Sequence, residues 1–334
     1  MNRRDFVIGM STAMGANMVS AEENSSPCKV LETEHIKNYP DIVHLTILRP
    51  GSYCLDRDWS QRKLGWFGSY GTGDTDMLRI YCGHVTVDMQ GHTLACNFER
   101  SGVTLSAKQS REFARQHFES AERPGVHFSN DSLDSRFVIL RNGTIDLTGG
   151  ERTWTGVAFD DAWGRVQFCN PYAEKRPKGI DATSYTRNEY LLENLKIYTQ
   201  DIGVLLEGSH NVIRNCVIHA QGQAAIACAG PNVIIENCEI WLKPSSGEQH
   251  VSKKMPRAAI HLRDGSNAII RNNIIRISEA EGDKPSAILI RDGAGDVLIE
   301  NNTFVNVTGE PVVLADNSQA VIRNNKTETR RIPW

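Results

Sequence analysis

Short apolar runs recur through the C-terminal half of the chain, and each run leads to an asparagine. Within a run, β-branched apolar residues alternate with polar ones, which is typical of a strand with one buried face and not of a helix. Successive asparagines lie 21, 22, 35, 29 and 23 residues apart, and a period in this range predicts a solenoid. These asparagines are Asn194, Asn215, Asn237, Asn272, Asn301 and Asn324, with an earlier copy at Asn142.

A second apolar phrase lies between successive asparagines. It begins with a small residue and then alternates, as in Gly203–Leu206 and Ala259–Leu262. Each turn of the solenoid is therefore predicted to hold one strand in this phrase, a second strand that ends at the asparagine, and a third short strand after it. We expect the asparagines to stack in register and bond the turn backbone, because asparagine tolerates left-handed turns and satisfies local amides. Further copies of the phrase begin at Gly125, Gly156, Ala225, Ala287 and Pro311.

Together the two phrases resemble the pectate-lyase-like superfamily of right-handed parallel β-helices. The resemblance covers about residues 78–325, and 85–94 resembles the first turn often seen in exported members. It implies an all-β fold, a right-handed parallel β-helix (solenoid), in which the strands of the second phrase form the floor of a substrate groove. The resemblance points to no single reaction, because one fold hosts many functions.

Departures from the period predict where loops interrupt the solenoid. Insertions are expected near 97–124, 161–189 and 243–257, and long loops on a rigid scaffold often carry function. The segment 107–121 in the first insertion is predicted as a short helix, because its apolar residues share one face. Such a helix would cap the open N-terminal end of the solenoid or flank the groove.

The first residues predict an export signal. Arg3 and Arg4 precede a modestly apolar run from Ile8 to Val19, and small residues follow it. Paired arginines before a short apolar region are typical of a twin-arginine signal, and an ordinary secretory signal is the alternative. Both signals send the mature protein to the periplasm or outside the cell. The domain plan is an export signal at 1–21, an N-terminal cap region at 22–77 and a β-helix domain at 78–334.

Composition and charge narrow the partners. The formal net charge is −3 and the pI is near 6.4, so the chain lacks the basic excess that nucleic-acid binding requires. No stretch after the N-terminus is long and apolar enough to span a membrane. The sequence has neither a CxxC pair nor an HExxH motif, so we expect no metal and no cofactor. We expect a monomer whose partner is a polysaccharide or oligosaccharide.

All eight cysteines follow the N-terminal apolar run. Cys216 and Cys238 occupy the same place in successive copies of the repeat. We predict that both are buried thiols, because free cysteine packs as a small hydrophobic residue. Cys54, Cys82 and Cys96 lie near the N-terminal cap and are candidates for disulfide pairing, which spacing alone does not decide.

Alternation in the second phrase fixes which side chains leave the core. Apolar positions two residues apart must point inward, so the positions between and after them point outward. The second outward column has an acidic end and a basic end, and stacking at about 4.8 Å makes Arg263 and Arg291 neighbours. The first column is His127, Ala158, Leu205, Ala227, His261 and Leu289, and the second is Ser129, Asp160, Glu207, Ala229, Arg263 and Arg291.

Two reactions on a uronate-containing polysaccharide fit these residues. A lyase must neutralise the carboxylate and remove the neighbouring proton. Arg263 and Arg291 are predicted to hold the carboxylate, with His261 as the base, since imidazole titrates near neutrality. A hydrolase instead uses two carboxylates that flank the glycosidic bond, and Asp160 and Glu207 are the first candidates.

A weaker resemblance to polygalacturonase motifs makes Asp181 and Asp201 the second pair of candidates for a hydrolase. The sequence departs from that family at 222–224, where Gly-Gln-Ala stands in place of Gly-His-Gly, and one of the paired aspartates is missing. No acidic cluster that would bind calcium is expected on this sheet. The residues assigned to substrate binding are His127, Asp181, Asp201, Lys253, Lys254 and Arg257.

The alternative function is a non-catalytic glycan-binding or cell-surface scaffold protein. Aromatic residues clustered on the groove would favour that reading, because they offer flat apolar faces to sugars. The available aromatic residues are Trp154, Trp163, Tyr172, Tyr185 and Trp241.

We predict that Arg3→Lys combined with Arg4→Lys retains the precursor in the cytoplasm. The reason is the paired-arginine head before a weakly apolar run, which is read by the twin-arginine route. Immunoblots of periplasmic and cytoplasmic fractions measure the result, and normal export of the double variant would identify the general secretory route instead.

Overall fold

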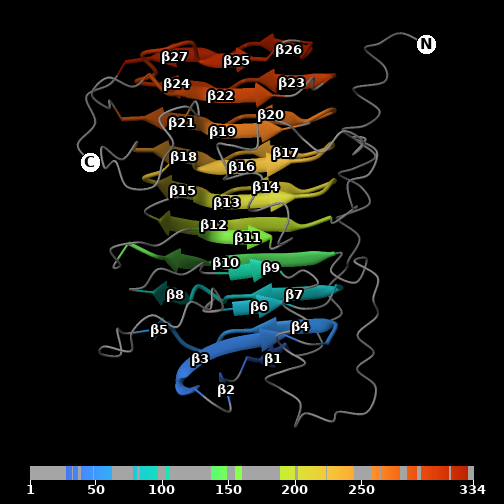
Figure 1. Ribbon diagram of the computed structural model, residues 1–334, viewed down its shortest axis with the longest axis vertical. Helices are drawn as coiled ribbons and strands as arrows, with labels where there is room; N and C mark the ends of the chain where they lie inside the picture. Colours follow the sequence, from blue (N-terminus) through green and yellow to red (C-terminus); the bar gives the residue numbers. More distant parts are fainter. Residues whose placement is uncertain are drawn as a thin grey trace.

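The computed structural model is an all-β solenoid in which the chain winds in successive turns from one end to the other (Figure 1). Every described element is a strand. The structure describes residues 28–31, 33–36, 39–47, 49–61, 78–80, 83–96, 103–105, 137–148, 155–159, 189–199, 202–222, 224–243, 257–263, 265–278, 284–291, 295–315 and 317–329.

Each turn of the solenoid contributes one strand to a ten-stranded sheet, which we call sheet 1. Its first strand, β2, pairs antiparallel with β3, and the other nine strands run parallel to their neighbours. The strands of sheet 1 are β2 (Thr33–Ile36), β3 (Tyr39–Ile47), β6 (Leu78–Ile80), β9 (Val103–Leu105), β11 (Thr155–Phe159), β13 (Ile202–Glu207), β16 (Ile226–Ala229), β19 (Ala258–Arg263), β22 (Ser286–Arg291) and β25 (Val312–Leu314).

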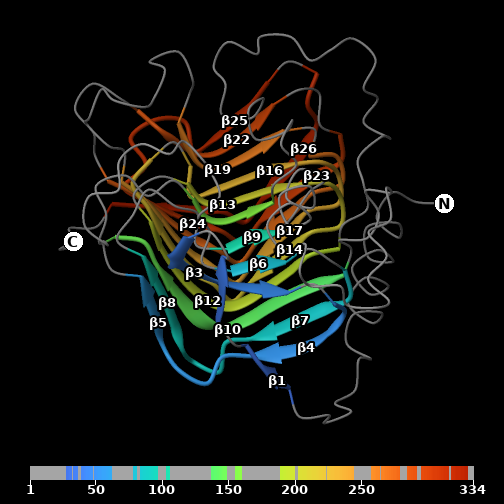
Figure 2. The ribbon, with the colours of Figure 1, turned by 60° about the horizontal axis from the view of Figure 1, so that its bottom comes forward.

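The second sheet has seventeen strands and bends at a corner, so we describe it as arm 1 and arm 2. In each turn the chain passes from sheet 1 to arm 1 and then to arm 2, which gives the solenoid three sides (Figure 2). Two long strands, β10 (Val138–Asp146) and β12 (Leu191–Thr199), run through both arms. The other strands of arm 1 are β1 (Lys29–Val30), β4 (Gly51–Cys54), β7 (Val85–Asp88), β14 (Val212–Arg214), β17 (Ile234–Glu236), β20 (Ile269–Arg271), β23 (Val297–Glu300) and β26 (Ala320–Arg323); those of arm 2 are β5 (Trp59–Gln61), β8 (Thr93–Cys96), β15 (Val217–Ala220), β18 (Glu239–Leu242), β21 (Ile274–Ile277), β24 (Thr303–Val305) and β27 (Lys326–Glu328).

The register of the parallel pairing confirms the predicted inward-facing residues. Val204, Ile226, Ile260 and Ile288 are Cα partners on successive turns, and each is fully buried in one continuous core. Since successive residues of a strand point to opposite faces, the same register places every second residue of these strands outside the core. The prediction of a parallel β-helix solenoid is therefore confirmed.

One asparagine in each turn from β10 onward turns the corner between arm 1 and arm 2. These asparagines are left-handed, with φ between 53° and 59°, as their spacing predicted. The expected stack of their side chains is found at one step, where Asn194 Nδ2 donates to Asn142 Oδ1 at 3.1 Å, but Asn194 and the later members are exposed. The corner asparagines act through their backbone, because asparagine enters the left-handed region more easily than most residues. They are Asn142, Asn194, Asn215, Asn237, Asn272, Asn301 and Asn324.

The buried amide ladder lies one residue further along the chain. Asn302 is fully buried, and its Oδ1 accepts hydrogen bonds from the backbone N–H and from the Nδ2 of Asn273, both at 3.0 Å. Its own Nδ2 donates to the carbonyl oxygen of Ile270 at 2.9 Å and to Asn325 Oδ1 at 3.0 Å. We did not predict this inner ladder, because asparagine fills the inner position only in the later turns and so does not recur with the repeat.

Two buried thiols continue the ladder toward the N-terminus, which confirms the prediction for Cys216 and Cys238. Both are free, with exposed fractions of 1 % and 2 %. The backbone N–H of Cys238 donates to Asn273 Oδ1 at 2.9 Å, so thiols and amides share one column. The pairing that spacing left open for Cys54 is a disulfide with Cys28, whose Cα lies 5.6 Å away. This bond fastens β1 to β4 at the N-terminal end.

The corner between sheet 1 and arm 1 also uses a left-handed residue in each turn from β7 to β23, which the sequence did not reveal. The φ angles there lie between 54° and 63°. No motif marks the corner because the residue type varies; His84 and Phe137 even stack their rings, with centroids 4.8 Å apart. The residues of this corner are His84, Phe137, Glu189, His210, Asn232, Asn267 and Asp296.

Outward side chains of arm 1 form a ladder of alternating charge beside the asparagine corner. Each arginine of this charge ladder lies within 3.0 Å of the carboxylate on the preceding turn. One exposed ion pair contributes at most about 1 kcal/mol, but alternation makes every step of the stack attractive and none repulsive. From the N-terminal end the ladder is Asp88, Arg141, Glu193, Arg214, Glu236, Arg271, Glu300 and Arg323.

Parallel pairing begins before residue 78. Strands β3, β4 and β5 pair in parallel with β6, β7 and β8, so one complete turn lies inside the segment 22–77 that we predicted as a cap region. The domain boundaries otherwise stay predictions. Outside the described residues lie the predicted helix at 107–121, Cys82, the side chain of Cys96 and most of the insertions near 97–124, 161–189 and 243–257.

We predict that Asn302→Leu lowers the free energy of unfolding by about 2–4 kcal/mol, because buried N–H and C=O groups of the adjacent turns lose their partners. Asn237→Leu, at the exposed corner, should cost only about 1–2 kcal/mol, from left-handed strain. Urea unfolding followed by circular dichroism compares the two variants. A larger loss for Asn237→Leu would mean that the inner ladder does not stabilise the solenoid.

Candidate functional site

The outer face of sheet 1 carries two columns of side chains, and the first of them is not the open groove floor that we expected. It runs through Leu205, Ala227, His261 and Leu289, which are Cα partners on β13, β16, β19 and β22. The exposed fraction is 1 % for Leu205 and Ala227, 7 % for His261 and 3 % for Leu289. The column is therefore covered, which alternation within a single strand does not reveal.

Part of the covered face is a second apolar cluster, separate from the core of the solenoid. Its residues lie on β13 and β16 or just before β16, and all of them are buried. They keep water away from this part of the face, and the half-buried Arg263 and Arg291 lie beyond it, on β19 and β22. The cluster consists of Ile202, Leu205, Ala224, Ala227 and Ala229.

The second column brings the two predicted arginines side by side. Arg263 on β19 and Arg291 on β22 are direct Cα partners, so their backbones lie about 4.8 Å apart. Both are half-buried and point away from the core, since Leu262 and Ile290 beside them are fully buried in it. The side chain of Arg291 forms no hydrogen bond or ion pair within the part of the chain that the structure describes. Adjacent guanidinium groups repel each other, and an anion bound between them removes that repulsion.

The predicted acidic end of this column can be placed only in part. The backbone of Glu207 pairs with Ala229, which in turn pairs with Arg263, so Glu207 stands two turns from Arg263, or about 10 Å. The side chain of Glu207 and the whole of Asp160 lie outside the described residues. Their role as a carboxylate pair stays a prediction.

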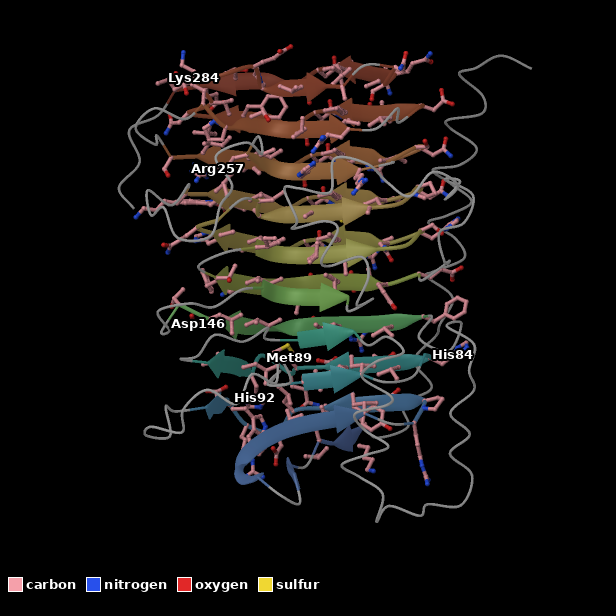
Figure 3. The ribbon with its side chains drawn as sticks, in the orientation of Figure 1. His84, Met89, His92, Asp146, Arg257 and Lys284 are labelled. Carbon is pink, nitrogen blue, oxygen red and sulfur yellow. A yellow bond between two sulfur atoms is a disulfide. The ribbon has the colours of Figure 1, made fainter. Side chains whose placement is uncertain are left out.

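Arg257 lies far from the arginine pair. It precedes the first residue of β19, whereas Arg263 ends that strand, and six residues of strand span about 20 Å. Figure 3 shows Arg257 at the edge of the solenoid, on the same side as Lys284, an exposed cation that precedes β22 and that the sequence did not single out. The remaining residues predicted to bind substrate lie outside the described part: His127, Asp181, Asp201, Lys253 and Lys254.

Strand β9 takes the place that we predicted for a strand at 125–128. Thr104 of β9 is the Cα partner of Ala158, where we expected His127 to stand. Gly102 precedes β9 as the small residue that opens the other copies of the phrase, but we did not recognise this copy, because the strand has only three residues.

Neither a metal site nor a membrane-spanning helix is found in the described ranges. No group of three or more His, Cys, Asp or Glu side chains is arranged there to hold a metal ion. No helix in those ranges has the length and apolar character needed to cross a bilayer.

Trp241, an aromatic residue that would have favoured a binding groove, lies on arm 2 and not on sheet 1. The His219 ring stacks on it with centroids 4.6 Å apart, and the Arg276 guanidinium carbon lies 5.0 Å from its centroid. Tyr198 meets His219 edge-on at 5.1 Å. Glu239 Oε1 accepts hydrogen bonds from Trp241 Nε1 at 2.8 Å and from Arg276 Nε at 3.2 Å. Because neighbours one turn away cover Trp241, its ring offers no open face for a sugar.

We predict that this arm 2 stack weakens in acid. Burial lowers the pKa of His219 below its usual value; Glu239 opposes this shift and Arg276 adds to it. Since the folded-state pKa lies below the unfolded value, the unfolded chain binds the proton more readily, and stability falls as the pH drops through about 6.5. His219→Phe keeps a stacked ring that does not titrate, so it should lose less stability in acid. Urea midpoints above and below this pH test the idea, and an unchanged pH dependence would refute it.

Comparison with known proteins bears on the fold. Residues 178–331 match the family model described as a right handed beta helix region. The chain is also similar to full-length tailspike protein 2 from an Escherichia coli O157:H7 bacteriophage, at 11 % identity and a TM-score of 0.47, over 85 % of this chain and 31 % of that one. It is similar to the enzymatically active domain of tailspike protein 2 from bacteriophage CBA120 at 10 % identity and a TM-score of 0.45, over 85 % of this chain and 35 % of that one.

No curated protein sequence matches this chain. The chain spans about a third of the length of the two tailspike chains, because the match covers 31 % of the first and 35 % of the second. Membership in the pectate-lyase-like superfamily and the twin-arginine signal stay predictions. The family match, together with the parallel pairing from turn to turn, makes the described part of this chain a right-handed parallel β-helix.

Proposed function

We propose that the protein binds an acidic polysaccharide at Arg263 and Arg291 and cleaves it there. The observation that carries this proposal is the position of the two arginines as Cα partners on the outer face of sheet 1, where Arg291 has no partner among the described residues. Planar guanidinium groups bind carboxylates bidentately, so two of them side by side can hold one uronate carboxylate.

The arginines of arm 1 support this reading by contrast. Each arginine of the charge ladder lies beside the carboxylate of the preceding turn, so its charge is compensated within the chain. The described residue stacked on Arg291 is instead another arginine. A column with two cations in succession is unfavourable by itself, which is the cost that an anionic ligand would offset.

β-Elimination is the reaction that best fits the arginine pair together with His261. The arginines would hold the carboxylate and stabilise the negative charge that develops when the neighbouring carbon loses its proton. His261, two residues before Arg263 on the same face, would accept that proton. The electron pair of the broken C–H bond then forms a C=C double bond, the bond to the glycosidic oxygen breaks, and that oxygen takes up a proton. The products are an unsaturated uronate and a new reducing end.

Two alternatives remain in view, and each has its own basis. Hydrolysis would use Asp160 and Glu207 as the two carboxylates that flank the glycosidic bond. Binding without cleavage is favoured by one specific observation, the low exposed fraction of His261, 7 %. A histidine with so little exposed surface can contact a substrate only when the reacting group of the substrate is held directly over it.

Export to the periplasm or the medium belongs to the same proposal. The disulfide between Cys28 and Cys54 supports an oxidising compartment, because disulfides form and persist there and are rare in the cytosol. The predicted signal at 1–21 would bring the chain to that compartment, where extracellular polysaccharides are accessible.

We predict that the mature protein releases reducing ends and unsaturated uronates from an acidic polysaccharide. Arg291→Ala should weaken binding about tenfold or more, which corresponds to about 1.5–3 kcal/mol for a charged hydrogen bond. His261→Ala should instead lower turnover by roughly 10²–10⁴ while binding survives. The measurement combines a reducing-end assay with ultraviolet absorbance over a panel of acidic and neutral polysaccharides.

Arg323→Ala is the matched control, because Arg323 is an exposed arginine on arm 1 and should leave activity unchanged. Reducing ends without unsaturation would identify a hydrolase, and binding without either product would identify a scaffold. Full activity of both Arg291→Ala and His261→Ala would place the site elsewhere.

A further inference from the structure

An aliphatic stripe runs along the outer face of arm 1. On this face each corner asparagine directly follows a residue of the charge ladder. The residue two positions before that charged residue also points outward, because side chains alternate between the two faces of a strand. In seven consecutive turns this outward residue is aliphatic, and each is the Cα partner of the next. The aliphatic stripe consists of Ile139, Leu191, Val212, Ile234, Ile269, Leu298 and Val321.

Strand propensity alone does not explain the aliphatic stripe. Arm 2 has a comparable outward column, and in the last six of these turns it mixes cations, an anion, a hydroxyl and two aliphatic residues. Both columns sit on parallel strands of one sheet, so β propensity acts on both alike. This outward column of arm 1 is therefore apolar in every one of these turns, whereas the arm 2 column is mixed. The arm 2 column is Lys196, Val217, Glu239, Ile274, Thr303 and Lys326.

The accessible part of the aliphatic stripe is its C-terminal half. Leu191 and Val212 are covered, with exposed fractions of 7 % each. Ile234, Ile269 and Leu298 are partly exposed, and Val321 is 55 % exposed. A contiguous exposed apolar surface of this kind is typical of a contact with another molecule.

The charge ladder beside this half of the stripe identifies the partner. Along β17, β20, β23 and β26 it reads Glu236, Arg271, Glu300 and Arg323, acid and base in alternation. Read in the reverse direction, the order is base and acid in alternation. If the ladder of a second copy lies antiparallel to this one, each residue therefore faces a residue of opposite charge. A second copy of the chain supplies that inverted surface, and an isologous interface requires such self-complementarity.

We propose that the protein is a homodimer in which two solenoids pack side by side and antiparallel through the C-terminal half of the aliphatic stripe. The two-fold axis lies between the turns of β20 and β23, perpendicular to both solenoid axes. Stripe then lies on stripe, and the charge ladders face each other with Arg271 opposite the partner's Glu300. This replaces the monomer that we expected from the sequence, and it does not depend on the proposed glycan site, which lies on sheet 1.

Light scattering coupled to size-exclusion chromatography of the mature protein, over a range of concentrations, tests the proposal. We expect the mass of a dimer at high concentration. Ile269→Lys should raise the dimer dissociation constant about tenfold or more, because both copies then bury a charge at the centre of the interface. Ile269→Thr keeps a β-branched residue on the strand and should weaken the dimer in the same direction, with circular dichroism confirming an intact fold.

Ile274→Lys is the matched control. Ile274 is 39 % exposed and follows Ile269 in the same turn, but on arm 2, so its change should leave the dimer intact. Small-angle scattering should give the profile of two rods side by side. A monomer at every concentration, a dimer that Ile269→Lys leaves unchanged, or an end-to-end profile would each overturn the proposal.

Discussion

Each turn of this solenoid is stacked in parallel register on the turn before it, and that register decides what every side chain meets. Equivalent residues lie about 4.8 Å apart, so a column of side chains behaves as one unit. The core is a set of aliphatic columns, the inner side of the asparagine corner is a column of thiols and amides, and arm 1 carries a column of alternating charge. In sheet 1 the same register places Arg263 and Arg291 in succession, and this is the step at which we propose that a ligand binds.

Much of this register could be predicted from the sequence because it depends on local alternation. The left-handed corner asparagines, the inward residues of sheet 1, the buried Cys216 and Cys238 and the adjacency of Arg263 and Arg291 all follow from short repeated phrases. Other features do not repeat in residue type. The inner amide ladder is asparagine only in the last turns, and the second corner is turned by residues as different as Phe137 and Asn232, because any residue that tolerates the left-handed region can serve there.

The burial of the first outward column of sheet 1 could not be predicted from the sequence, for a different reason. Alternation states which way Leu205 or His261 points, but it cannot state what packs on that side, since burial there depends on contacts remote in the sequence. The low exposure of His261 therefore limits how a substrate can approach, whereas Arg263 and Arg291 stay more accessible. The two outer surfaces then have separate roles in our proposals: sheet 1 offers the guanidinium group of Arg291, beside Arg263, to a glycan, and arm 1 offers apolar surface to a second copy.

The most direct test of the account is a crystal structure of the mature protein with an acidic oligosaccharide that it binds. The account predicts a uronate carboxylate within hydrogen-bonding distance of both guanidinium groups, Arg263 and Arg291, on the outer face of β19 and β22. An oligosaccharide bound at arm 2 or at the Arg257 edge, with the arginine pair empty, would contradict it.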